Sequence, residues 1–232
     1  MSTPTDPRIL ILETSGRTGE VALACGPKII RHRILDETRL HARDLAPAVS
    51  AMLNEEGWKP AEIQALMVNR GPGSYTGLRV GLMSAKAFAY ATGCALLAVD
   101  GFAAIARQSS ADAIDVIADA QRGLVYQQRF TRSAESQEVV PVTVLQIVDL
   151  STWIQSLTAG GWVSGPGLRK FSDRLPGHTK IPPESLWDPH PESILEIGLN
   201  RHRAGERDDQ WTVEPLYLRP SSAEEKWAGK DQ

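Results

Sequence analysis

The 232-residue sequence has only two cysteines and no long apolar run. Cys25 and Cys94 form neither a CxxC pair nor a zinc-ligand spacing, so we interpret both as small buried side chains, and nothing points to an oxidising compartment. No stretch approaches the roughly 18 apolar residues that a membrane span needs, and the N-terminus lacks the pattern of a signal peptide. These absences predict a cytoplasmic protein that does not associate with membranes.

An excess of positive charge is also missing. The chain carries 25 Lys and Arg against 28 Asp and Glu, a net charge of −3, so no whole-molecule positive field would attract nucleic acid. Short basic clusters occur at residues 31–33, 39–43 and 201–203, and we interpret each as solvated surface. If RNA is involved, we expect a partner to supply much of its binding surface.

Motifs of enzymatic sites are absent as well. The five histidines form no HExxH, HxxxH or compact metal-binding group, and no GxSxG elbow or cysteine-nucleophile signature occurs. The sequence therefore predicts no catalytic residue and no metal site.

What the chain does contain is an ordinary globular composition, 42% hydrophobic and 23% charged, with clear periodic segments. Asp44 can cap a first helix, and Gly57 can end it. Three adjoining strands followed by alternating helices and strands predict an α/β layer with a mixed sheet. The expected order is strands 8–13, 20–25 and 28–35, helix 45–56, strand 65–69, helix 78–92, strand 95–99 and helix 102–108.

The second half repeats the layout of the first. A strand at 114–119, a turn and a strand at 124–130 resemble the first hairpin, and Val163–Gly167 resembles Val68–Gly73. Two such echoes in the same order favour an internal duplication and therefore two related lobes. We expect a first lobe at residues 1–109, a smaller second lobe at 110–190, and a helix and extended tail at 191–232 that pack back on the lobes.

A Gly-rich segment, residues 71–77, joins the strand at 65–69 to the long helix. Such a turn can aim backbone N–H groups and a helix dipole at an anion, although the pattern is neither GxGxxG nor Walker A. The alternative is purely structural, with glycines shaping the turn and Ser74 or Thr76 capping the helix. The residues of this candidate anion or nucleotide site are Gly71, Gly73, Ser74, Thr76 and Gly77, with Thr14 and Ser15.

Glu13 and Asp119 each end a predicted strand beside a turn of small residues. In two-lobed phosphotransfer folds, acids at these positions can hold Mg²⁺ through water. Alternatively, each carboxylate accepts hydrogen bonds from its own turn, and we favour that interpretation.

The long helix is apolar on more than one side, so it must bury more than one side. Small residues recur every fourth position at Gly77, Gly81, Ala85 and Ala89, and a seam of this kind lets another helix approach closely. That helix is either the chain's own segment 45–56 or a partner's.

Four segments in order closely resemble the bacterial TsaB family, also called YeaZ. They are Ile9–Ser15 (ILILETS), Gly71–Gly81 (GPGSYTGLRVG), Ile117–Tyr126 (IADAQRGLVY) and Glu214–Arg219 (EPLYLR), and the resemblance covers nearly the whole chain. His41 resembles the family's usual histidine ahead of the first long helix. One departure is Glu13, where the family usually has Asp.

The resemblance implies an actin-like ATPase, ribonuclease-H-like fold of two related lobes with mixed sheets flanked by helices. It also implies membership of the complex that adds a threonylcarbamoyl group to the adenosine next to the anticodon of tRNAs reading ANN codons. A metal-containing paralogue, TsaD, performs the transfer, this type of subunit activates it by dimerising, and the ATPase TsaE joins them. The expected partners are thus a TsaD-like paralogue, a TsaE-like ATPase and, through the complex, tRNA.

The family's dimer contact uses the first two long helices. The predicted partner interface is Leu45, Val49, Met52, Leu53, Leu78, Gly81, Leu82, Ala85 and Ala89. No intrinsic cofactor is expected, whereas ATP or ADP at the complex interface and a homodimer in the absence of the partner stay open. The alternative function is a small-molecule kinase or ATPase of the same fold that uses residues 71–77 for phosphates.

Overall fold

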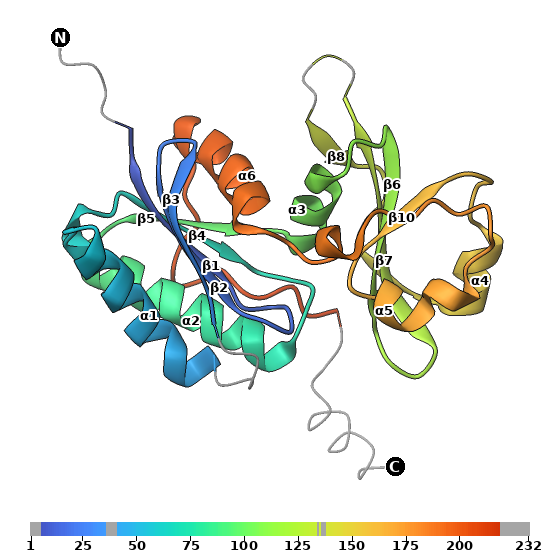
Figure 1. Ribbon diagram of the computed structural model, residues 1–232, viewed down its shortest axis with the longest axis horizontal. Coiled ribbons are helices and arrows are strands. Elements are labelled where there is room, and N and C mark those ends of the chain that lie inside the picture. The colour runs from blue at the N-terminus through green and yellow to red at the C-terminus, as the bar shows by residue number, and fades with distance from the viewer. Residues whose placement is uncertain (1–5, 36–40, 134, 136–137, 219–232) are drawn as a thin grey trace.

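The computed structural model describes residues 6–35, 41–133, 135 and 138–218, with only the backbone described at 41 and 42. Two mixed sheets lie side by side, each flanked by helices (Figure 1), which confirms the predicted α/β fold. The first sheet has the order β3-β2-β1-β4-β5, and the second has the order β10-β6-β7-β8, with β9 also paired to β7. The strands of the first sheet are β1 (Arg8–Glu13), β2 (Glu20–Cys25), β3 (Lys28–Ile34), β4 (Ala65–Asn69) and β5 (Ala95–Val99).

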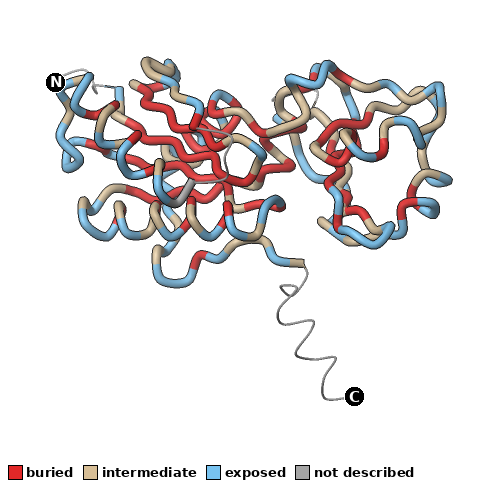
Figure 2. Tube along the Cα trace, turned by 60° about the horizontal axis from the view of Figure 1, so that its bottom comes forward, coloured by how far each residue is buried: buried red, intermediate tan, exposed pale blue. Residues whose placement is uncertain are grey.

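Helices cover both faces of the first sheet, and its strands β1, β2, β4 and β5 are correspondingly buried, whereas the edge strand β3 (KIIRHRI) is charged and partly exposed. Strands β1 and β2 form an antiparallel hairpin, and β4 runs parallel to both β1 and β5. Helices α1 (His41–Glu55) and α2 (Tyr75–Thr92) pack on one face, and α6 (Pro191–Arg203) packs on the other (Figure 1). A strand buried on both faces reads as a continuous apolar run, which explains ILIL in β1 and ALMV in β4. Figure 2 shows these strands as the most deeply buried part of the chain.

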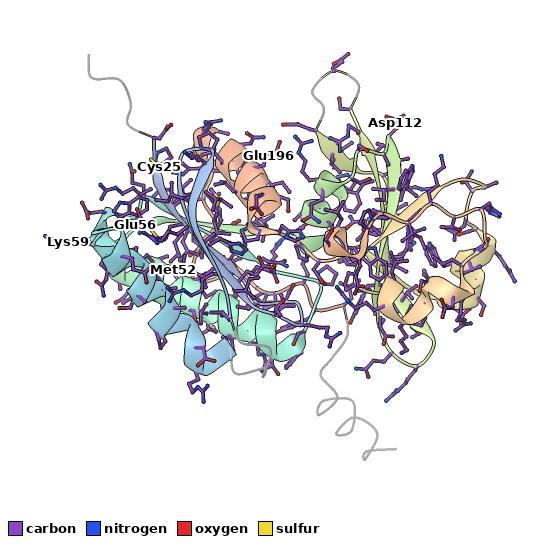
Figure 3. The ribbon with its side chains drawn as sticks, in the orientation of Figure 1. Cys25, Met52, Glu56, Lys59, Asp112 and Glu196 are labelled. Carbon is purple, nitrogen blue, oxygen red and sulfur yellow. The ribbon has the colours of Figure 1, made fainter. Side chains whose placement is uncertain are left out.

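Two helix starts differ from the sequence prediction. Helix α1 begins at His41, so Asp44 lies in its first turn and does not cap it. Helix α2 begins at Tyr75 because the Ser74 hydroxyl accepts a hydrogen bond from the Gly77 N–H at 3.3 Å. Met52 of α1 is directed at the sheet and is buried there (Figure 3).

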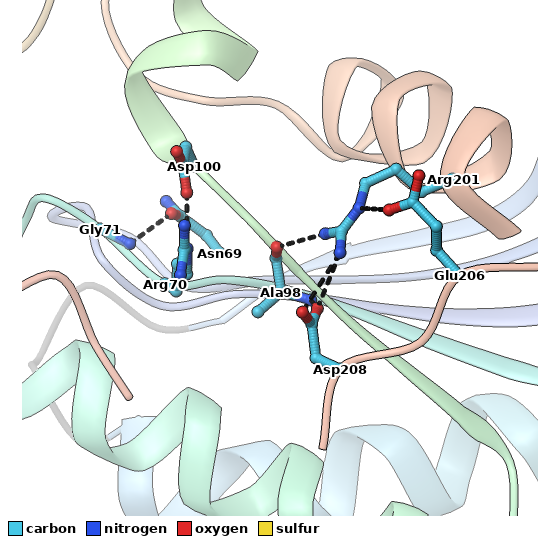
Figure 4. Close-up of polar contacts among 8 residues, drawn as sticks. All are labelled: Asn69, Arg70, Gly71, Ala98, Asp100, Arg201, Glu206 and Asp208. Atoms are coloured by element: carbon cyan, nitrogen blue, oxygen red, sulfur yellow. Dashed lines mark hydrogen bonds and ion pairs between the residues drawn. The ribbon is translucent and has the colours of Figure 1, made fainter. Parts of the chain in front are cut away.

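The outer edge of β5 is closed by the end of α6 and the segment after it (Figure 4). The Arg201 guanidinium donates to the Ala98 carbonyl at 2.8 Å, and the Asp208 carboxylate accepts from the Ala98 N–H at 2.7 Å. The Asp208 N–H donates to the Leu96 carbonyl, and Arg201 also pairs with Glu206. These contacts occupy backbone groups that an open sheet edge would leave unpaired.

After this edge the chain returns along α2 as an extended segment, residues 209–218, which we call the C-terminal strap. Near its start, the Trp211 ring stands edge-to-face on Tyr90, with centroids 5.4 Å apart. Near its end, the Tyr217 ring lies 4.8 Å from Tyr75. The strap therefore contacts α2 close to both of that helix's ends.

The second sheet repeats the strand arrangement of the first. Strands β6 (Ala113–Asp119) and β7 (Leu124–Arg132) are antiparallel, and β10 (Trp162–Ser164) runs parallel to β6. Gly165 after β10 has φ +112°, close to the +116° of Gly71 after β4, and each of these glycines precedes a proline. The two sequence echoes thus occupy equivalent places in the two lobes.

The sequence did not predict the remaining short elements of the second lobe. They are β8 (Val139–Pro141), β9 (Gln146–Asp149), α4 (Leu150–Gln155) and α5 (Leu168–Phe171). Helix α3 (Gly101–Gln108) lies between the two sheets and packs on both β6 and α6 (Figure 1). In the part of the chain that the structure describes, no helix is both long and apolar enough to cross a bilayer.

Candidate functional site: the outer face of helices α1 and α2

Helix α2 uses its small residues to approach its own sheet. A Cβ atom on Gly77 would lie 1.9 Å from the Thr14 carbonyl oxygen, and one on Gly81 would lie 2.2 Å from the Thr14 hydroxyl. The Thr14 hydroxyl donates a hydrogen bond to the Gly77 carbonyl at 2.7 Å. Because neither glycine has a side chain, the N-terminal half of α2 can contact the end of β1 directly.

This packing shows where the residues of the predicted partner interface lie within the chain. Eight of its nine residues are buried within the chain itself and Val49 is half-buried, and of the nine Leu45, Val49 and Leu53 line an open groove between α1 and α2. The physical reason is that the small-residue seam faces β1 and β4, whereas a partner would need the opposite side of α2. The eight buried residues are Leu45, Met52, Leu53, Leu78, Gly81, Leu82, Ala85 and Ala89.

The opposite side of α2 is apolar and exposed. Met83 is 62% exposed and Tyr90 is 68% exposed, two helical turns apart on the same side. Val80 lies about one turn before Met83 and is half-buried. Ala87 lies about one turn after Met83 and is exposed. We call Val80, Met83, Ala87 and Tyr90 the outer stripe. The sequence had shown that α2 is apolar on more than one side. The apolar residues outside the small-residue seam are the sequence signal that could have identified this stripe.

An apolar groove of about 250 Å³ opens between α1 and α2, beside the outer stripe. Its floor is formed by Leu10 and Leu12 of β1. An apolar cavity of about 150 Å³ accepts benzene, so this groove has room for a large apolar side chain. The helix residues that line it include Leu45, Val49 and Leu53 of α1 and Ser84 and Phe88 of α2.

A buried polar network fixes the end of β1 and the start of the Gly-rich segment. The Glu13 carboxylate accepts hydrogen bonds from the Ser15 N–H at 2.5 Å and from the Asn69 amide at 2.6 Å. The Asn69 side-chain oxygen accepts in turn from the Gly71 N–H at 2.8 Å. Burial raises the pKa of the Glu13 carboxyl from 4.5 to about 7, against the opposing effect of its hydrogen bonds to Ser15 and Asn69. This acid is satisfied entirely by its own turn and by β4.

Asp119 has the equivalent place in the second lobe. Its carboxylate accepts from the Gln121 N–H at 2.8 Å and pairs with the Lys170 ammonium at 2.6 Å. For Glu13 and Asp119 alike, the interpretation that each carboxylate binds its own turn is confirmed.

Most of the predicted anion-binding donors are already used inside the chain. The N–H groups of Ser15 and Gly71 donate to side chains of the network, the Ser74 N–H donates to the Ser15 carbonyl, and that of Gly77 donates to Ser74. A Cβ on Gly73 would lie 2.6 Å from Ser15, and Thr14 donates to Gly77, as described above. The geometry supports the structural interpretation of residues 71–77 as a turn that seats α2, in which Gly73, Ser74 and Thr76 are exposed.

Among the residues with a described position, no set of three or more His, Cys, Asp or Glu side chains is placed to hold a metal ion. His41 is the first residue of α1, and its side chain lies outside the described part.

Comparison with known proteins gives the same family from sequence and from structure. The family model described as TsaD, tRNA N6-adenosine threonylcarbamoyltransferase, matches residues 28–153, more than half of the chain. The TsaB protein of Bacillus subtilis, named for tRNA threonylcarbamoyladenosine biosynthesis, is 28% identical over 94% of this chain and 97% of its own length. The Escherichia coli protein of the same name is also 28% identical, over 97% of this chain and its entire length.

The fold agrees with a solved structure. YeaZ from Pseudomonas aeruginosa superposes with a TM-score of 0.76 at 24% identity, over 91% of this chain and all of that one. The chain therefore belongs to the family that the TsaD model describes and, within it, to the TsaB or YeaZ group, with the actin-like, ribonuclease-H-like fold.

Proposed function

We propose that this chain is the non-catalytic, activating subunit of the complex that adds a threonylcarbamoyl group to the adenosine next to the anticodon of tRNAs reading ANN codons. In this proposal it acts by dimerising with a TsaD-like catalytic paralogue. The role in threonylcarbamoyladenosine biosynthesis is supported by TsaB relatives that match over nearly the full length of both chains.

The outer face of the α1–α2 layer carries the proposal. Met83 and Tyr90 expose apolar surface on a helix whose other apolar side is already buried, and the groove beside them is open. An uncovered apolar face of this kind favours a protein partner. A helix of that partner would cover the outer stripe and place a large side chain in the groove.

The same face bears on the other proposed partners. The outer stripe contains no charged side chain, so tRNA and a TsaE-like ATPase would join through the complex and not through this stripe. Any ATP or ADP would bind at the complex interface. When the paralogue is absent, two copies of the chain could cover the same face by twofold symmetry.

The test is depletion of the chain in its source cell, followed by mass analysis of tRNA nucleosides. We expect threonylcarbamoyladenosine to fall and to be restored by the wild-type chain and by Val144→Asp. Met83→Asp should fail to restore it, because it puts a charge on the outer stripe. Val144 is the matched control, since it is 77% exposed and lies in the second lobe. Unchanged threonylcarbamoyladenosine after depletion would refute the function.

The kinase or ATPase alternative is tested by calorimetric titration of the isolated chain with ATP and Mg²⁺. Because the N–H groups of Ser15, Gly71 and Ser74 are bonded within the chain, we expect no turnover and no tight binding. Turnover by the chain alone would favour the alternative.

A further inference from the structure

Two large aromatic side chains are exposed next to each other where the C-terminal strap passes α2. Trp211 is 71% exposed and Tyr90 is 68% exposed. Their rings are in an edge-to-face arrangement, with an interplanar angle of 71°. Each ring covers part of the other, yet most of this aromatic surface faces solvent, which is unusual for a pair that serves only the chain's own packing.

The strap holds Trp211 in a fixed place. Asp209 organises the turn around it, because its carboxylate accepts from the Trp211 N–H at 2.9 Å and its carbonyl accepts from the Val213 N–H at 2.9 Å. Val213 is buried in the core, and Asp208, just before the turn, is bonded to β5. These bonds fix the backbone at Trp211, and the Tyr90 ring contacts its side chain, so ordering Trp211 on binding costs less than ordering a residue of a free loop.

The aromatic pair extends the outer stripe. Tyr90 is the last member of the stripe, two turns after Met83, and Trp211 adds to it from the strap. Apolar contact surface thus runs from the groove between α1 and α2, across Met83, to Trp211.

We propose that Tyr90 and Trp211 form an aromatic anchor for the TsaD-type paralogue, which makes the strap a second partner-binding element beside the two helices. This inference rests on the proposed function. Trp and Tyr are the side chains that most often dominate the binding energy of protein interfaces. The occupant we infer is an apolar helical surface of the paralogue, which would cover the four apolar side chains of the outer stripe, with Lys86 of α2 beside them.

The position of the anchor in the sequence adds a consequence for specificity. The family model matches residues 28–153, which include α1 and α2 but not the strap. Tyr90 therefore belongs to the part shared with the transferases, and Trp211 does not. We expect Trp211 to be contributed by this subunit and not by the transferase. The anchor would then help to distinguish this subunit of the pair from the catalytic one.

A single-stranded RNA is the other kind of molecule that stacks on exposed aromatic rings. Such binding combines stacking with a cationic groove along the backbone. The two cationic residues of α2 are Arg79 and Lys86, and the Arg79 guanidinium already lies 4.2 Å from the centre of the Tyr75 ring. The observations favour a protein surface, and RNA is kept as an outcome of the test.

The test uses the full chain and the purified TsaD-type paralogue, with affinity measured by calorimetry for wild type, Trp211→Ala, Tyr90→Ala and the double variant. We expect each single change to weaken binding by about tenfold or more. The double variant should lose less than the product of the two effects, because the rings contact each other. Trp211→Phe should retain most of the affinity, Val144→Ala should be unchanged, and the thermal unfolding midpoint of each chain alone should stay near that of wild type.

Each other outcome has a distinct meaning. Binding by wild type with Trp211→Ala within twofold of it would overturn the anchor and leave the proposed function standing. Unchanged affinity for the paralogue, together with weaker binding of tRNA to the complex, would assign the pair to RNA and also overturn it. Failure of the wild-type chain to bind the paralogue at all would refute the proposed function itself.

Discussion

At the scale of single residues, Glu13 is the most informative side chain. It is only 2% exposed, and both carboxylate oxygens accept hydrogen bonds from the protein. Its raised pKa of about 7 means that the folded chain holds a proton that the unfolded chain loses near 4.5. The contribution of Glu13 to the stability of the fold therefore falls as pH rises from about 4.5 to 7, and it levels off above that range.

Replacing Glu13 with Gln should remove this pH dependence. From pH 4.5 to 8, the free energy of unfolding of wild type should fall relative to that of Glu13→Gln by up to about 3 kcal/mol, the value expected for a shift of this size. The prediction concerns the change with pH alone. The two proteins also differ in free energy of unfolding at low pH, because Gln can accept only one of the two hydrogen bonds that Glu13 accepts. Urea unfolding at a series of pH values measures the difference.

The control for this change is Glu192→Gln, at an exposed position in the first turn of α6. Its curve should run parallel to that of wild type. If the curves of wild type and Glu13→Gln were also parallel, Glu13 would not titrate as described.

The sequence showed why Glu13 mattered but could not decide between its two roles. An acid at the end of a strand can either reach for a cation or turn back on its own loop. The choice depends on Asn69, which lies 56 positions away in the sequence and donates to Glu13 only because β4 pairs with β1. Long-range pairing of this kind is not visible in local sequence.

At the scale of elements, the close approach of α2 to β1 determines which side of α2 remains free. In the interior of an exposed helix, replacing Gly with Ala usually stabilises by about 1 kcal/mol. Gly77→Ala should instead destabilise by about 1–3 kcal/mol, because the new methyl group would meet the Thr14 carbonyl. Chemical denaturation of the purified variant measures the change.

The matched control for that substitution is Gly177→Ala, where an added Cβ meets nothing within 4 Å. It should change the free energy of unfolding by no more than about 0.5 kcal/mol. A Gly77→Ala variant as stable as wild type would show that α2 does not depend on this contact.

Sequence periodicity predicted the elements of the first lobe because their apolar runs are long and their ends are marked by Gly and Pro. The start of α1 differed by four residues and that of α2 by three, since capping is decided by local geometry such as the Ser74 hydrogen bond. Strands β8 and β9 were missed because they are short and half-exposed, and their position is set by pairing with β7.

The candidate site was predicted only in part. The sequence indicated that α2 must bury more than one side, and it assigned the small-residue side to a partner. Spacing alone does not say which side meets the sheet, and in the structure the small-residue side of α2 packs against Thr14 through Gly77 and Gly81. Trp211 could not have been placed beside Tyr90 at all, because the strap returns from 121 positions away.

At the scale of the whole molecule, the first lobe combines a covered sheet with an open outer helical face. The first lobe buries both faces of its sheet and keeps the outer face of α1 and α2 apolar and open. The division into residues 1–109, 110–190 and 191–232 stays a prediction, although α6 and the strap both pack on the first lobe. The proposed role of the molecule follows from that open face: it binds a related chain and does not act alone.

The most direct test is the affinity of the purified chain for its TsaD-type paralogue, with Met83→Asp and Val144→Asp compared by calorimetry. Both changes place the same charge on an exposed apolar position, one on the outer stripe and one in the second lobe. We predict binding by wild type, a loss of about tenfold or more for Met83→Asp, and no more than a twofold change for Val144→Asp. Equal affinities for the two variants, with both chains folded, would contradict the account.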